Sequence, residues 1–134
     1  MNLGIDFGST YTILSTYRED QQKLEAVEAD KGKNNVNVPS IVSLRKDNIR
    51  YGTSAKKLTG KKNVRTFKAF KMLLMEKNQA FVKARHYDET YTPQWAAKTF
   101  LGEVIAEAQR QNGASSVENG QFCQGFRSCY RIAI

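Results

Sequence analysis

The chain has few of the residues that cross-link a fold. Only two cysteines, Cys123 and Cys129, occur among its 134 residues. Two thiols in a chain of this length do not make a disulfide framework, and their spacing is not one that metal-binding knuckles use. We therefore expect both cysteines to be free thiols without a function.

Long apolar runs are missing as well. No segment approaches the ~20 apolar residues that cross a bilayer. The first residues lack the basic and apolar regions of a secretory signal, which predicts a cytoplasmic protein without membrane contact. The one histidine, His86, has no partner set for a metal site or a catalytic triad, so we interpret it as a loop residue.

Acidic residues are scarce in the middle of the chain. The net charge is +8, yet 13 basic and two acidic residues between Arg45 and Arg85 give that stretch +11. This balance favours anionic partners such as nucleotides, nucleic acid or an acidic surface. Because no nucleic-acid motif accompanies the charge, nucleic acid is not the favoured partner, and a solvated basic face is the simpler interpretation.

Short apolar and β-branched runs separated by polar turns fill the first half of the chain. They predict a meander of mostly antiparallel strands. The expected strands cover residues 3–7, 11–17, 23–29, 41–44 and 49–51.

Helical patterns dominate the second half. The strongest begins with Thr92 as N-cap and Pro93 as first helical residue and ends at Asn112-Gly113. Its apolar stripe is Ala97, Leu101, Val104, Ile105 and Ala108. We expect shorter helices from Thr53 or Ser54 to Leu58 and, capped by Thr66, to about Lys77. Residues 78–91 fit one weak strand, and residues 129–134 fit a last strand.

The segment between the first two predicted strands reads Ile-Asp-Phe-Gly-Ser-Thr-Tyr-Thr. Gly8 lets the backbone approach a phosphate closely, and the amides of Ser9, Thr10 and Tyr11 can form an anion-binding nest. Asp6, at the end of a buried strand, can hold Mg²⁺ through its water shell. A P-loop is excluded, because a strand follows the turn and no Gly-Lys-Ser/Thr is present. The alternative is an ordinary hairpin with a polar turn.

This segment resembles the first phosphate motif of the actin, sugar-kinase and heat-shock ATPase superfamily. The match is closest to the heat-shock-protein-70 (DnaK-type) chaperones, which open with Gly-Ile-Asp-Leu-Gly-Thr-Thr-Tyr-Ser. Further blocks follow in the family's order, at residues 38–42, 51–56, 66–74 and 91–93. The likeness covers residues 2–112. It implies an α/β fold, a partial actin-like (ribonuclease H-like) ATPase lobe with a strand meander, short helices and one long helix.

The resemblance also implies roles for matched positions. Asp6 would act on the magnesium hydration shell, and Gly8, Ser9, Thr10 and Tyr11 would cradle the β- and γ-phosphates of ATP or ADP. Lys71 matches the family's catalytic lysine, which contacts the γ-phosphate and the attacking water. A fixed ammonium there would stabilise charge on the transferring phosphoryl group.

Several family motifs do not occur in this sequence. The second phosphate loop, the glycine-rich adenosine site and the peptide-binding domain are absent. We expect residues 1–113 to form the N-terminal part of the nucleotide-binding domain. Residues 114–134 read as an atypical tail, produced by truncation or frameshift. ATP hydrolysis is then not expected from this chain alone.

Two functional hypotheses follow from the sequence. The first is an N-terminal fragment of an ATP-dependent chaperone, whose complete form would work with unfolded clients and co-chaperones. The second is a small stand-alone basic module that binds nucleic acid or another anionic surface. A sugar- or carboxylate-kinase fragment is a third option, but the blocks at residues 38–42 and 66–74 resemble chaperones specifically.

Overall fold

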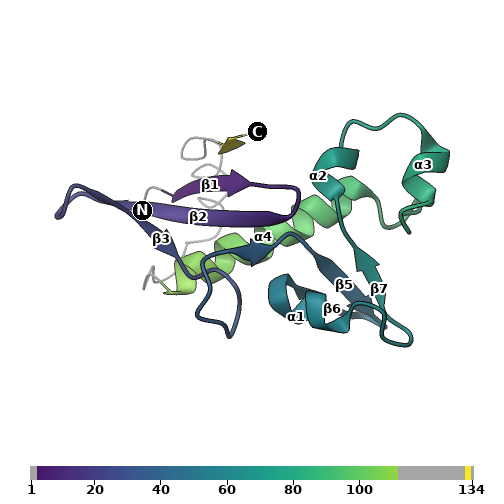
Figure 1. Ribbon diagram of the computed structural model, residues 1–134, viewed down its shortest axis with the longest axis horizontal. Helices are drawn as coiled ribbons and strands as arrows, with labels where there is room; N and C mark the ends of the chain where they lie inside the picture. The colour runs from purple at the N-terminus through teal and green to yellow at the C-terminus, as the bar shows by residue number, and fades with distance from the viewer. Residues whose placement is uncertain (1–2, 112–131, 134) are drawn as a thin grey trace.

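A computed structural model of the chain describes residues 3–111 and 132–133 (Figure 1). Over these residues the chain is a mixed α/β structure with two small sheets, three short helices and one long helix, which confirms the expected class. The elements are β1 (Leu3–Phe7), β2 (Tyr11–Arg18), β3 (Lys23–Val27), β4 (Val38–Pro39), β5 (Val42–Arg45), β6 (Asn48–Tyr51), α1 (Gly52–Leu58), β7 (Arg65–Phe67), α2 (Phe70–Leu73), α3 (Gln79–Lys83), α4 (Pro93–Gln111) and β8 (Ile132–Ala133).

The larger sheet has the strand order β3-β2-β1-β8, and β4 pairs with one end of β2. β1, β2 and β3 are antiparallel neighbours, whereas β8 runs parallel to β1. Side chains alternate between the faces of a strand, so Leu3, Ile5 and Phe7 of β1 share one buried face with their partners on β2. Asp6 consequently lies on the opposite face.

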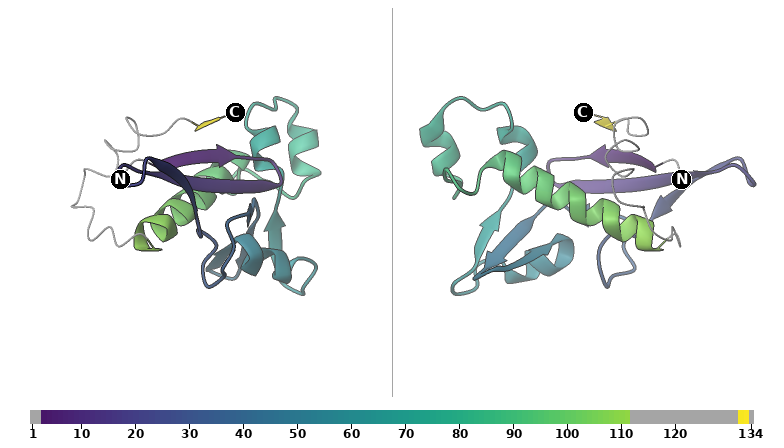
Figure 2. Two further views of the ribbon diagram at one scale, coloured as in Figure 1. Left: turned by 60° about the vertical axis from the view of Figure 1, so that its left-hand side comes forward. Right: turned by 180° about the vertical axis from the view of Figure 1, so that it is seen from behind.

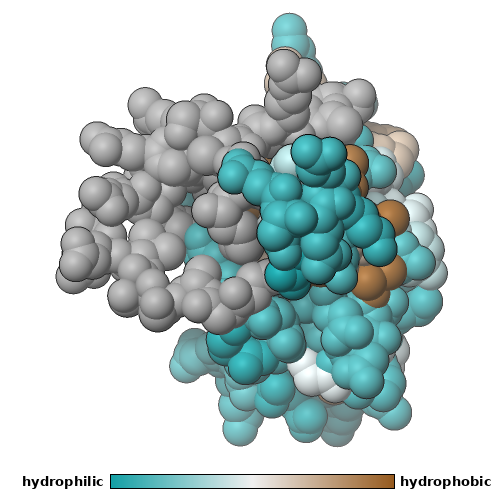
Figure 3. All heavy atoms as spheres, turned by 90° about the vertical axis from the view of Figure 1, so that its left-hand side faces the viewer, coloured by the Kyte–Doolittle hydropathy of each residue, from teal (hydrophilic) through white to brown (hydrophobic). Residues whose placement is uncertain are grey.

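The outer part of the β2–β3 hairpin extends beyond this core. Arg18 and Glu25 form an ion pair across it, with 2.5 Å between Nε and Oε2. Figure 3 views the molecule from the hairpin end, and the described atoms on this face are mainly hydrophilic. Of the five residues of β3, only Val27 is buried in the core.

The smaller sheet has the order β6-β5-β7 and packs against α1. The cap of α1 is non-local: the buried Asp30 carboxylate accepts hydrogen bonds from the Thr53 amide and hydroxyl. The sequence predicted that Thr53 or Ser54 caps this helix, and this prediction is wrong. Gly52 has a φ of 64°, and a Cβ there would lie 2.4 Å from Asp30 Oδ1, so the close approach requires glycine.

Helix α4 covers one face of the larger sheet (Figures 1 and 2) and contributes more residues to the hydrophobic core than any other described element. Thr92 caps it as predicted, accepting a hydrogen bond from the Trp95 amide at 3.0 Å. Phe100 is fully buried, and its ring lies 5.5 Å from that of Phe70 and 6.3 Å from that of Phe7. Leu101 of the predicted stripe is partly buried and packs against the core. The prediction omitted Phe100, which is fully buried.

The segment between β7 and α4 differs most from the prediction. Thr66 lies in β7, opposite Ser43 of β5, so it caps no helix. The expected helix to Lys77 shrinks to the four residues of α2, which begins after Ala69 in a left-handed conformation (φ 54°). The weak strand proposed for residues 78–91 is instead helix α3, because the Asn78 side chain accepts hydrogen bonds from two amides of the first turn.

The atypical tail expected at residues 114–134 lies outside the described residues, apart from Ile132 and Ala133, which form β8. Cys123 and Cys129 also lie outside them. Among the described residues, no helix is both long enough and apolar enough to span a bilayer.

Candidate functional site

The turn between β1 and β2 comprises Gly8, Ser9 and Thr10. Its chain path is so tight that a Cβ on Gly8 would lie 2.1 Å from the carbonyl oxygen of Tyr11. No real Cβ tolerates such a contact with backbone, so a larger residue would force the turn open. The predicted need for glycine is therefore physical, but the close approach is to the chain's own carbonyl group.

Ser40, a buried residue that follows β4, forms hydrogen bonds to the turn. Its amide donates to the Thr10 carbonyl at 2.9 Å, and its hydroxyl donates to the Gly8 carbonyl at 2.8 Å. The same hydroxyl lies 2.9 Å from the buried Thr12 hydroxyl. In the sequence, the block around Ser40 shows only a resemblance to the family. Its hydrogen bond to Gly8 joins residues that are far apart in the sequence, so local sequence patterns could not predict it.

Part of the turn is exposed to solvent. Thr10 is exposed, Gly8 and Ser9 are partly buried, and the Tyr11 side chain is 46% exposed. The carbonyl groups of Gly8 and Thr10 are engaged by Ser40. That the amides of Ser9, Thr10 and Tyr11 face an anion stays a prediction from the sequence.

Lys71 comes to the turn from 64 residues away. Its Nζ donates to the carbonyl oxygen of Phe7 at 2.6 Å and lies 5.8 Å from the Phe7 ring. Phe70 and Leu73, on either side of it in α2, are buried in the core and fix the helix against α4. The fold thus places an ammonium group beside the residue that leads into Gly8.

Asp6 lies on the exposed face of β1, two residues before Gly8. Within residues 3–111 its carboxylate takes part in none of the observed ion pairs or side-chain hydrogen bonds. No group of three or more His, Cys, Asp or Glu side chains in the described part of the chain could hold a metal ion. A lone carboxylate suits contact with a metal's water shell and does not form a complete metal site.

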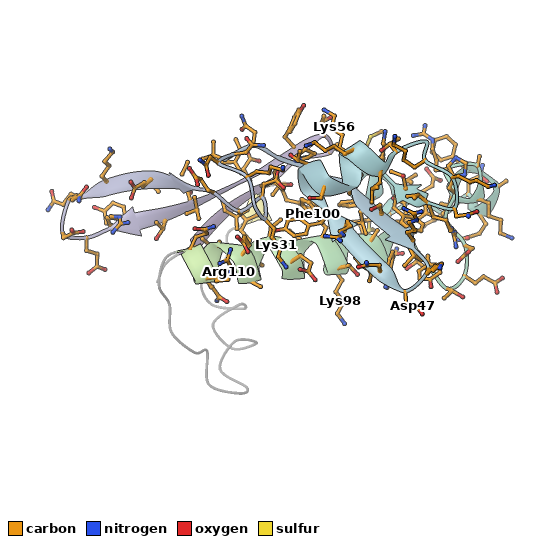
Figure 4. The ribbon with its side chains drawn as sticks, turned by 90° about the horizontal axis from the view of Figure 1, so that it is seen from below. Lys31, Asp47, Lys56, Lys98, Phe100 and Arg110 are labelled. Atoms are coloured by element: carbon orange, nitrogen blue, oxygen red, sulfur yellow. The ribbon has the colours of Figure 1, made fainter. Side chains whose placement is uncertain are left out.

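A second cation lies near the turn. Lys56 Nζ is 5.9 Å from the centre of the Tyr11 ring, and Figure 4 shows Lys56 at the edge of the molecule away from α4. Lys56 is the last residue of one of the blocks that resemble the family, but its place in the sequence predicted no role for it. Two lysines from different helices, Lys56 and Lys71, therefore contact the residues that flank the turn, Tyr11 and Phe7.

Comparison with known proteins identifies a family match. The model of the family described as Hsp70 protein matches residues 2–94, more than half of the chain. No curated protein matches the chain. The matched range includes the turn, Asp6, Ser40, Lys56 and Lys71.

Proposed function

Since the chain belongs to the Hsp70 family, we propose that its β1–β2 turn binds the phosphates of ATP or ADP as one side of a chaperone nucleotide site. The observation that carries this proposal is the pairing of a glycine-dependent turn with Lys71. The turn is held by Ser40, and Lys71 Nζ lies 2.6 Å from the carbonyl oxygen that precedes Gly8.

The turn would act as a preformed cradle. Its carbonyl groups at Gly8 and Thr10 are already bonded to Ser40, which leaves amides and hydroxyls of Ser9, Thr10 and Tyr11 to face the β- and γ-phosphates. Such donors stabilise negative charge most when they need no rearrangement. The clamp by Ser40 provides that rigidity.

Lys71 would act on the negative charge of the phosphates, and Asp6 on the waters of a positively charged Mg²⁺. The Lys71 ammonium can leave the Phe7 carbonyl and contact a γ-phosphate oxygen, where it would stabilise charge during transfer. Asp6 would orient waters of a bound Mg²⁺, which neutralises phosphate charge when present. We propose Lys71 and Asp6 as the catalytic pair of this side of the site.

The proposal assigns ATP-driven chaperone activity to the complete protein only. There, nucleotide binding and hydrolysis would drive capture and release of unfolded clients, assisted by co-chaperones. This sequence contains neither the second phosphate loop nor the adenosine site of the family. We therefore expect ATP to bind this chain weakly, with a Kd on the order of 100 μM or above, and no measurable hydrolysis.

Titration of the ¹⁵N-labelled full chain with MgATP tests the proposal, with amide shifts of Ser9, Thr10 and Tyr11 as the readout. Gly8→Ala should abolish these shifts because its Cβ displaces the Tyr11 carbonyl. Gly102→Ala is the matched control, since a Cβ at Gly102 meets nothing within 4 Å.

A second pair of variants covers the case in which Gly8→Ala does not fold. Lys71→Met should weaken binding about tenfold through loss of a charge-assisted contact, whereas Lys62→Met, an exposed cation outside the site, should not. Low-micromolar binding that Gly8→Ala leaves unchanged would refute the proposal, as would shifts confined to other parts of the chain.

A further inference from the structure

A second basic site lies on the smaller sheet. A cavity of about 350 Å³ opens between the β5–β6 hairpin and α1. None of its lining residues belongs to the β1–β2 turn. The lining consists of Arg45, Asn48, Arg50, Ser54, Lys57 and Leu58.

Strand register explains why these side chains meet. Arg45 pairs with Asn48, and Arg50 pairs with Ser43, two residues before Arg45. Paired residues and residues two apart on a strand share a face, so both arginines project on the side where α1 packs. Ser54 and Lys57 are three residues apart in α1 and therefore lie on one side of that helix.

The three cations of this cavity have no observed acidic partner. The ion pairs among the described residues involve Arg18, Arg65 and Arg110 as the cations, and none of the cavity residues. The nearby Asp47 lies at the tip of the hairpin (Figure 4) and does not line the cavity. Three like charges gathered without a carboxylate repel one another, and a bound anion would relieve that repulsion.

We propose that this cavity binds a phosphate group carried by a small molecule, independently of the nucleotide site. Guanidinium groups match phosphate oxygens with two parallel hydrogen bonds, and Lys57 adds a mobile point charge. The Ser54 hydroxyl and the Asn48 amide supply neutral donors. A cavity of about 350 Å³ accommodates a phosphate or diphosphate, whereas a nucleic-acid strand would need a longer track of charge.

The larger basic cavity, of about 730 Å³ beside β7, is a weaker candidate. There, Arg65 already donates to Asp88 at 3.0 Å and to the His86 carbonyl at 2.8 Å. A hydrogen bond from the Tyr91 amide, and to a smaller extent the Arg65 guanidinium, lowers the pKa of Asp88, so this carboxylate remains charged. The positive charge of this larger cavity is thus partly neutralised within the chain, unlike that of the cavity between the β5–β6 hairpin and α1.

The test is a titration of the ¹⁵N-labelled full chain with inorganic pyrophosphate at low salt. We expect saturable shifts at the amides of Asn48, Arg50 and Ser54, with a Kd on the order of 1 mM or below. Arg50→Gln should weaken binding roughly fivefold to tenfold. Lys62→Gln removes the same charge outside the cavity and should change the Kd less than twofold.

Lys57→Gln serves as the second cavity variant and should resemble Arg50→Gln. Equal weakening by Lys57→Gln and Lys62→Gln would overturn the proposal, since only net charge would then matter. Shifts that never saturate would also overturn it. A third result would also refute it: a ten-nucleotide single strand gives saturable shifts at these amides and pyrophosphate does not. Binding of that strand should then weaken steeply on added salt. Because the readout separates these amides from Ser9 and Thr10, either site can fail without the other.

Discussion

Replacing Ser40 by alanine should destabilise the chain by removing the clamp on the β1–β2 turn. Ser40 is 2% exposed, and its hydroxyl donates to the Gly8 carbonyl at 2.8 Å and meets the Thr12 hydroxyl at 2.9 Å. Ser40→Ala leaves the Gly8 carbonyl oxygen and the Thr12 hydroxyl oxygen without the Ser40 hydroxyl as a hydrogen-bond partner. Since Thr12 is fully buried, we expect a loss of about 2–3 kcal/mol in the free energy of unfolding.

Urea unfolding of the full chain, followed by far-UV circular dichroism, measures this loss. With an m-value of about 1.3 kcal/mol/M for a domain of this size, the midpoint should fall by about 2 M. A double-mutant cycle with Thr12→Val isolates the hydroxyl pair. Thr12→Val removes the oxygen that Ser40→Ala leaves unpaired, so the double variant should lose about 1 kcal/mol less than the sum of the single variants.

Ser43→Ala is a matched control for this experiment. Ser43 is as buried as Ser40, but its hydroxyl has no hydrogen-bond partner in the described structure. Its removal should therefore cost less than about 0.5 kcal/mol, or stabilise the chain slightly. Similar losses for Ser40→Ala and Ser43→Ala would refute the reasoning, because burial rather than hydrogen bonding would then set the cost.

Three further outcomes follow from the long helix. Phe100→Ala should cost about 3–5 kcal/mol in urea unfolding, because the ring fills the centre of the core. Gly102→Ala should raise the free energy of unfolding by about 0.5–1 kcal/mol, since this exposed helical site has room for a methyl group. Glu107 has a pKa held below its ordinary 4.5, first by the Arg110 guanidinium and then by Gln111. A lowered folded pKa adds stability that is fully present above pH 4.5 and is lost as the pH falls through the folded pKa, so the destabilisation by Glu107→Gln should shrink in urea melts below pH 4.5.

Local patterns predicted the elements that local contacts stabilise. Helix α4 begins at the predicted cap, and its apolar side chains recur with the period of a helix, so both its start and its buried face were largely readable. The strands β1 and β2 were equally clear, because a short turn joins them and their apolar residues alternate. The α/β class and the family were implied by the resemblance that the turn motif and the ordered blocks after it carry.

The errors and omissions have one physical cause, which is that distant residues decide the outcome. Thr66 has the chemistry of a helix cap, yet pairing with Ser43 draws it into a strand. Helix α1 is capped by Asp30, 23 residues before Thr53. Ser40 reaches the turn from 32 residues after Gly8. Neither propensity nor spacing along the chain contains these contacts.

The same contacts would preorganise the turn for the phosphate binding that we propose. Ser40 fixes its carbonyl groups on one side, and Lys71 occupies the carbonyl that leads into it on the other. In the proposed site a ligand would not have to order the turn, and Lys71 would exchange its hydrogen bond to the Phe7 carbonyl for one to the ligand. The entropy cost of ordering is instead met during folding, through the burial of Phe70 and Leu73 that places α2. Variants that loosen α2 without touching Lys71 should thus weaken phosphate binding in proportion to the stability they remove from that helix.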